Sequence, residues 1–240
     1  RASIDFLLGV ILAALLFAVL CGGVKRIGCI AEELVPYAAV GYLLLCLIIL
    51  IVRIQEIPHA FSMIVEGAFR PNALTGGIVG SVFTVLRAGI SRGVFTNEAG
   101  MGTAGIAHSS ANVNHPAEQG MMGIVEVFID TIVICTMTAL VILCSDLTIT
   151  FGADTGALLT TQAFASILGD WVCIPLAVFM CCFAFATVLG WAVYGNQCVC
   201  FLFGEKRVIF FTMAQIVMIL FSAVADTAAV WTAAQAVNGL

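Results

Sequence analysis

Charged residues are scarce in this sequence. Only 10% of its 240 residues are Asp, Glu, Lys or Arg, whereas 62% are hydrophobic. In a soluble domain roughly a quarter of the residues are charged, so this chain has too few charges to cover a surface that faces water. Several apolar runs also reach the length of about 20 residues that crosses a bilayer. The composition therefore predicts a multi-pass membrane protein.

Basic clusters and metal-binding patterns are missing as well. The nine Lys and Arg residues occur singly or in pairs and the net charge is −5, which argues against a nucleic acid as partner. None of the ten cysteines has the spacing of a zinc site. No Ser/His/Asp or Cys/His arrangement stands out. We therefore expect no enzyme, no organic cofactor and no structural metal.

Apolar runs divide the chain into predicted membrane spans. We expect these spans at residues 4–21, 34–52, 76–90, 121–143, 171–203 and 208–224, with the start of another at 230–240. Short helices are expected at 59–69 and 158–168, and a linker at 112–119. The chain opens on Arg1 and stops as an apolar segment begins, so we expect a piece of a longer protein.

One long stretch, residues 93–111, is rich in glycine and small polar residues and lies between two apolar runs. In a membrane protein, backbone outside a helix is tolerated only within protein or beside a wet cavity. Interrupted helices are where carriers place substrates and ions. Residues 100–105 fit the GxGxxG pattern of a dinucleotide site, but the βαβ context that this site needs is missing. The stretch, called the polar break below, therefore predicts a substrate or ion site.

Phe95, Thr96 and Asn97 add an aromatic ring, a hydroxyl and an amide to this break, close to Gly100 and Gly102. The two ends of a broken helix offer N–H groups to a carboxylate and C=O groups to a cation. Together these groups suit a small zwitterion. The alternative is that Thr96 or Asn97 only caps a helix.

Three carboxylates, Glu98, Glu126 and Asp130, lie at or near membrane depth. Such groups are costly in lipid and usually face the bundle interior. Glu126 and Asp130 are four residues apart and so share one face of a regular helix. The functional interpretation is an ion or proton path, and the structural alternative is a buried pair with Arg87 or Arg92.

A polar face is also predicted in the 171–203 span, where Thr187, Trp191 and Tyr194 follow helical spacing. The Thr187 hydroxyl can serve as a ligand for a cation, although a threonine on a helix more often bonds back to the preceding turn. His108 and His115 are the two histidines in and just after the polar break. We interpret His115 as part of the solvated linker and leave the role of His108 open.

Residues 92–103, which read RGVFTNEAGMGT, resemble the signature RGxFSNEAG[LM]GS of the alanine or glycine:cation symporters. This group is also called the sodium:alanine symporter family, within the amino acid-polyamine-organocation superfamily. The IAH of residues 106–108 fits the same signature. Further similar segments are GGVKRI at 22–27, LVP at 34–36, FIDT at 128–131, FAF at 183–185 and LFGEK at 202–206. The resemblance covers essentially the whole chain.

The resemblance implies a sodium-coupled symporter of small neutral amino acids, chiefly alanine and glycine. It implies an all-α membrane protein with part of a LeuT-like inverted-repeat bundle, namely helices four to nine and the start of ten. Residues 1–75 would hold the last two helices of the first repeat and an external linker. Residues 76–240 would hold the second repeat, in which the polar break corresponds to discontinuous helix six.

On this basis we predict substrate binding by Phe95, Thr96, Asn97, Gly100 and Gly102. In addition, Thr187 is the predicted cation ligand, and Asp130 and Glu98 are the predicted coupling or gating residues. The expected partners are alanine or glycine, Na⁺ as the coupling ion, membrane lipid, and the missing N-terminal helices of the same protein. The expected location is the plasma or inner cell membrane.

Two positions depart from the family pattern. Ala186 stands where relatives often have Ser beside the Thr187 hydroxyl, and Asn196-Gln197 replace a charged Glu-Lys pair. The resemblance also implies that the first three helices, which include the other broken helix, are absent from the chain, so this piece is not expected to transport alone. The alternatives are a proton-coupled carrier, a channel, or a non-transporting receptor or scaffold on the same fold.

Overall fold

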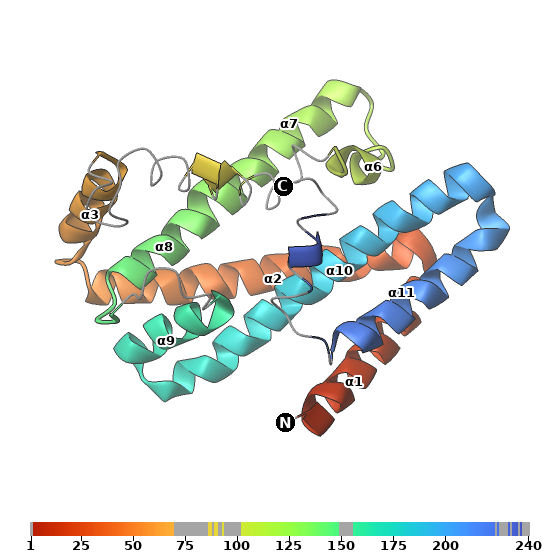
Figure 1. The fold of residues 1–240 in the computed structure, drawn as a ribbon. Helices are drawn as coiled ribbons and strands as arrows, with labels where there is room; N and C mark the ends of the chain where they lie inside the picture. Colours follow the sequence, from red (N-terminus) through yellow and green to blue (C-terminus); the bar gives the residue numbers. More distant parts are fainter. Residues whose placement is uncertain are drawn as a thin grey trace. The chain divides into compact units, whose positions relative to one another are not determined.

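The computed structural model describes residues 2–69, 86–87, 89–90, 93, 102–148, 156–223, 225, 230, 232–234 and 236. Within these residues every regular element is a helix and no strand occurs (Figure 1). The predicted all-helical class is therefore confirmed. The finer prediction of a LeuT-like inverted repeat, with its division at residue 75, remains a prediction.

Helices make up most of the described part of the chain. In order they are α1 (Ala2–Leu20), α2 (Gly23–Val52), α3 (Ile57–Phe69), α6 (Ala104–His108), α7 (Pro116–Val127), η1 (Phe128–Cys135), α8 (Thr136–Leu143), α9 (Gly156–Leu168), η2 (Asp170–Val172), α10 (Cys173–Phe203), η3 (Glu205–Arg207) and α11 (Val208–Ser222). Among the described residues, three helices are long and apolar enough to cross a membrane, at Arg26–Val52, Pro116–Leu143 and Asp170–Phe203.

Most predicted spans agree with these helices to within a few residues. The exception is the span expected at 34–52, because α2 already begins at Gly23 and Pro36 lies inside it rather than in its first turn. Membrane helices tolerate such a proline because neighbouring groups satisfy the freed carbonyl. The span expected at 76–90 lies largely outside the described residues. The described residues beyond 229 are helical, as the final predicted span requires.

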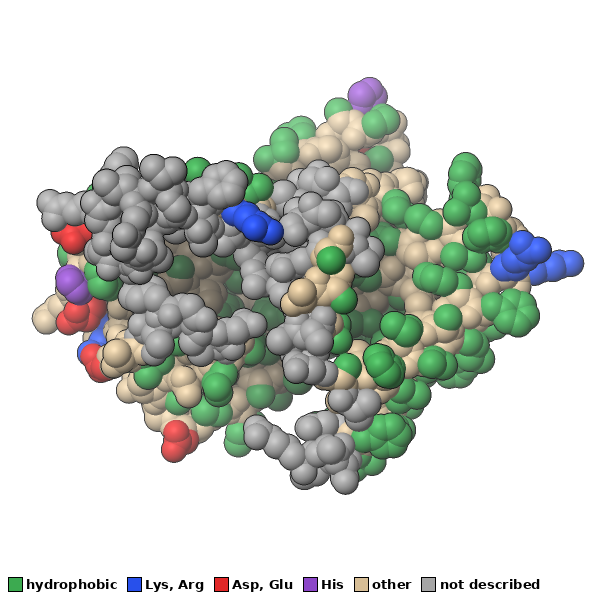
Figure 2. Space-filling model, in the orientation of Figure 1, with side chains coloured by type: hydrophobic (Ala, Val, Ile, Leu, Met, Phe, Trp, Pro, Cys, Tyr) green, Lys and Arg blue, Asp and Glu red, His purple; other side chains and the backbone are tan. Residues whose placement is uncertain are grey.

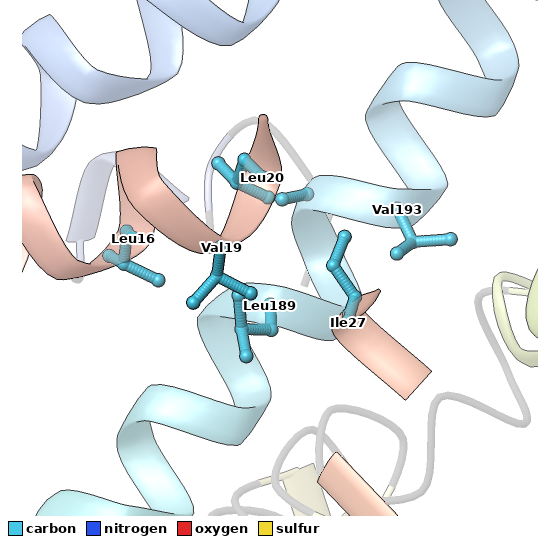
Figure 3. Close-up of a cluster of buried hydrophobic side chains, with 7 residues drawn as sticks. Leu16, Val19, Leu20, Ile27, Leu189 and Val193 are labelled. Atoms are coloured by element: carbon cyan, nitrogen blue, oxygen red, sulfur yellow. The ribbon is translucent and has the colours of Figure 1, made fainter. Parts of the chain in front are cut away.

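The chain forms two compact units, and α2 and α10 contribute to both. Unit 1 comprises residues 1–36, 105–110 and 182–240, and unit 2 comprises residues 37–104 and 111–181. In unit 1 the buried core joins α1, the start of α2 and the middle of α10 (Figure 3). Its members are Leu16, Val19, Leu20, Ile27, Leu189, Ala192 and Val193.

The surface of unit 1 is apolar where a soluble protein would be polar. Figure 2 shows hydrophobic side chains over the exposed surface of α11, and Phe210, Val217 and Phe221 are among its exposed residues. Large exposed apolar surfaces mark contact with a partner or with membrane. With the long apolar helices, this surface fits a protein that is solvated by lipid.

In unit 2 the second half of α2 packs against α8 and α9. Tyr42 is buried and its ring lies 5.8 Å from the ring of Phe164, which is fully buried in α9. The Tyr42 hydroxyl lies 2.7 Å from Thr138 Oγ1 on α8. Where α2 and α8 end, Arg53 forms an ion pair with Asp146. These contacts hold three elements that are distant in sequence.

Gly9 allows the close approach of α1 to the end of α11, and this gives a test of the packing. A Cβ added at Gly9 would lie 2.4 Å from Ala223 Cβ, which is too short to be relieved by rotation of either side chain. We expect Gly9→Ala to lower the free energy of unfolding by about 1–3 kcal/mol, measured by thermal unfolding in detergent. Gly28→Ala on α2 is the control, since no atom lies within 4 Å of its added Cβ. Equal stability of the two variants would contradict this packing.

Candidate functional site

Most of the predicted substrate site lies outside the described residues. This applies to Phe95, Thr96, Asn97, Glu98 and Gly100, so their roles stay predictions. The structure does describe Gly102 and Asp130 in unit 2, and Thr187 in unit 1. The C-terminal border of the polar break is described too.

At that border the chain makes a turn and then enters a helix. Gly102 has a φ of +72°, a left-handed conformation that glycine adopts without steric cost. Helix α6 then runs from Ala104 to His108. Ser109 and Ser110 follow it, and their hydroxyls donate to carbonyls one turn back, those of Ile106 and Ala107, each at 2.7 Å. The polar residues at this end of the break therefore complete a helix terminus.

The connection to α7 is shorter than predicted. Residues 112–119 were expected to form a linker, but α7 starts at Pro116 with His115 as its N-cap. His115 Nδ1 accepts a hydrogen bond from the Ala117 N–H at 3.1 Å. Pro116 at the first helical position and Glu118 in the first turn are both typical of a helix start. That pattern was visible in the sequence and was missed because histidine is not among the usual capping residues.

Asp130 lies in a wide helical turn that interrupts the Pro116–Leu143 span. Residues Phe128–Cys135 form a π-helix, η1, between α7 and α8. Such segments are rare and frequently occur at functional sites. Asp130 is partly buried, whereas Glu126 on α7 is exposed. The sequence did not reveal this turn, because the apolar pattern of the span fits a regular α-helix equally well.

Thr187 makes the local bond that was considered as its alternative role. Its Oγ1 donates to the Phe183 carbonyl at 2.9 Å, and the side chain is exposed on α10. This bond uses the only hydroxyl proton, so the oxygen lone pairs remain able to accept. One turn further on, Trp191 and Tyr194 form an edge-to-face pair with ring centroids 6.0 Å apart. The predicted polar face is thus an aromatic contact next to a hydroxyl.

Sequence reasoning missed two polar contacts between helices. One is the Tyr42–Thr138 hydrogen bond in unit 2. The other lies in unit 1, where the Thr212 hydroxyl donates to Asn196 Oδ1 at 3.3 Å. Thr212 is 5% exposed and is the buried polar residue of the described core. Pairs this remote in one sequence carry no local signal that would reveal them.

The conformation of Gly102 gives a direct test at the border of the break. An alanine there would be forced into the left-handed region, which costs roughly 1–2 kcal/mol. We expect Gly102→Ala to lower the free energy of unfolding by about that amount in a thermal melt. Gly105→Ala is the control, because Gly105 lies within α6 and both glycines have no atom within 4 Å of an added Cβ. An unchanged melt for Gly102→Ala would rule out the left-handed turn.

Comparison with known proteins places the chain among transporters. The family model described as "Sodium:alanine symporter family" matches residues 2–240. The chain is 38% identical over 236 residues to the sodium/alanine symporter AgcS of Methanococcus maripaludis, covering 96% of this chain and 51% of that protein. It is 37% identical over 234 residues to the probable sodium/glutamine symporter GlnT of Bacillus subtilis, covering 97% and 48%.

The chain is also 39% identical over 135 residues to the sodium/proton-dependent alanine carrier protein of Bacillus sp. strain PS3. This match covers 56% of this chain and 30% of that protein. Nearly the whole chain is matched by the curated relatives AgcS and GlnT, but it spans only about half of their length. The family and the relatives named here are transporters rather than enzymes, and membership of this family confirms the prediction of a multi-pass protein of the cell membrane. The chain belongs to the sodium:alanine symporter family.

Proposed function

We propose that the protein containing this chain is a secondary active transporter that couples the inward gradient of sodium to uptake of a small neutral amino acid, alanine or glycine. The observation that carries this proposal is the match to a symporter family over residues 2–240. The relative from Methanococcus maripaludis is named a sodium/alanine symporter. The mechanism is alternating access, in which one helix bundle rocks against the rest around a central site.

The chain would supply one half of this transporter. In the proposed arrangement it holds helices four to nine and the start of ten of a LeuT-like fold, with residues 1–75 in the first repeat and residues 76–240 in the second. The substrate would bind at the polar break through Phe95, Thr96, Asn97, Gly100 and Gly102. The turn at Gly102 supports a helix interrupted there. The preceding helices of the same protein would supply the other half of the site.

The cation and coupling groups are proposed on the described helices and in the break. Thr187 would be a sodium ligand, which its free lone pairs and exposed position support. Asp130 would couple ion binding to the conformational change, together with Glu98 of the break. The partly buried place of Asp130 in a π-helix supports this role, because ionisable groups inside membrane spans are expensive and usually functional.

Proton coupling is the second candidate. The relative from Bacillus sp. strain PS3 is named a sodium/proton-dependent alanine carrier, and a carboxylate such as Asp130 can carry a proton. The substrate also has a competitor, since the Bacillus subtilis relative is named a probable sodium/glutamine symporter. Both questions are decided by the same uptake assay.

We expect the full-length protein in proteoliposomes to take up labelled alanine when a sodium gradient is imposed. Asn97→Ala should abolish most of this uptake, because it removes an amide from the proposed substrate site. Asn114→Ala is the matched control, since Asn114 is exposed in the turn before α7. Uptake that is driven by a pH gradient and is the same with and without a sodium gradient would favour proton coupling. Folded protein that takes up no small amino acid would overturn the proposal.

The proposed sodium ligand has its own test. Thr187→Val should raise the sodium concentration for half-maximal uptake roughly tenfold, since it removes one oxygen from a cation, whereas Thr187→Ser should keep the wild-type value. Thr161→Val is the matched control, because Thr161 makes the same bond to the preceding turn, donating to Ala157 O at 2.9 Å. If both valine variants respond alike to sodium, Thr187 is no ligand.

A further inference from the structure

A short relay of hydroxyl groups reaches the wide turn η1 from α2. Thr138 Oγ1 donates to the carbonyl of Ile134 at 2.8 Å, and Ile134 is the second-to-last residue of η1. A hydroxyl has one proton to donate. The 2.7 Å contact with Tyr42 therefore has Tyr42 as donor and Thr138 as acceptor. The relay runs from the Tyr42 O–H through Thr138 to the backbone of the π-helix.

The donor end of this relay is fixed in place. Tyr42 is 5% exposed, and its ring packs on Phe164 at 5.8 Å between centroids. A buried ring that is held by another ring has little rotational freedom, so its hydroxyl points in one direction. The relay therefore ties the carbonyl end of η1 to a rigid part of unit 2.

The two sides of η1 are packed very differently. Neither α7 nor η1 has a buried residue. On the other side, α8 buries Leu140 and Val141. Tyr42 and Thr138 thus stand at the boundary between an anchored half and an exposed half of one membrane span.

The hydrogen-bonding pattern of η1 determines the direction in which the Asp130 side chain points. Each residue of an α-helix adds about 100° of rotation, so residues five apart point about 140° apart. In a π-helix the hydrogen bonds join residues five apart instead, a separation that Asp130 and Cys135 have within η1. If η1 changed to α-helical hydrogen bonding, α7 and the first residues of η1 would rotate about the helix axis relative to α8. Asp130 is one of those residues.

We propose that Tyr42 and Thr138 are positioning residues that hold η1 in its wide form and so fix the direction of the Asp130 carboxylate. Only one part of this inference, that sodium coupling depends on the relay, rests on the proposed function. The geometric part concerns unit 2 alone. Tyr42→Phe removes the donor hydroxyl and keeps the ring on Phe164, so it tests the relay with little change in packing.

The geometric test is the labelling of a cysteine at position 130, D130C, in the full-length protein, read at that position by peptide mass spectrometry. We expect the rate of alkylation to change at least about threefold when Y42F is added. This factor corresponds to the average free energy of an interhelical hydrogen bond in a membrane. Y37F is the matched control, since Tyr37 lies on the same helix and is 79% exposed. Equal labelling in the Y42F and Y37F backgrounds would overturn the proposal, whether or not the protein transports.

The functional test uses sodium-driven alanine uptake without D130C. Y42F and T138V should each raise the sodium concentration for half-maximal uptake about threefold, while Y37F and T138S, which keeps the hydroxyl, should match the wild type. A merely stabilising bond would lower the melting temperature and leave this sodium dependence unchanged, which would reject the coupling role. Wild-type protein without sodium-driven uptake would reject the proposed function and leave the labelling result to decide the geometry.

Discussion

Backbone hydrogen bonding without water is the constraint on which the rest of this structure depends. In the hydrocarbon core each N–H and C=O must find a partner inside the protein, since an unsatisfied group costs several kcal/mol. Long helices meet this requirement within a single segment, and the described residues accordingly form helices. The wide turn Phe128–Cys135 departs from regular bonding, and there the Thr138 hydroxyl bonds the Ile134 carbonyl. The carbonyl near the end of this turn thus has a side-chain donor as a partner.

Packing in the two units relies on small residues and on sparse polar contacts. Lipid is as apolar as leucine, so close van der Waals contact and interhelical hydrogen bonds drive helix association in a membrane. In unit 1, Gly195 leaves space for the Phe211 ring, which would be 2.5 Å from an added Cβ. In unit 2, Gly41 does the same for Phe179, at 2.4 Å. Among the described residues, hydrogen bonds also join side chains of different helices, Thr212 with Asn196 in unit 1 and Tyr42 with Thr138 in unit 2.

Local and periodic features were predictable from the sequence, and remote or irregular ones were not. The apolar runs gave the helices of the described part, because the length of a run directly reflects the thickness of the bilayer. The start of α2 was misplaced because Glu32 and Glu33 interrupt the apolar run, yet the helix already begins at Gly23. The π-helix around Asp130 was missed because its sequence fits an ordinary helix. The Tyr42–Thr138 bond joins residues 96 positions apart, a separation over which local patterns carry no information.

Helical threonines link the packing to the proposed ion site. Thr138, Thr161 and Thr187 each donate to a carbonyl four residues earlier. That bond occupies the hydroxyl proton and leaves an oxygen that can accept from outside the helix. At Thr138 the Tyr42 phenol occupies this acceptor position. Thr187 is exposed on α10, so its oxygen is presented away from the core. The local bond at Thr138 leaves an oxygen that accepts from Tyr42 on another helix, and the same bond at Thr187 leaves an oxygen able to coordinate the cation that the proposed function requires.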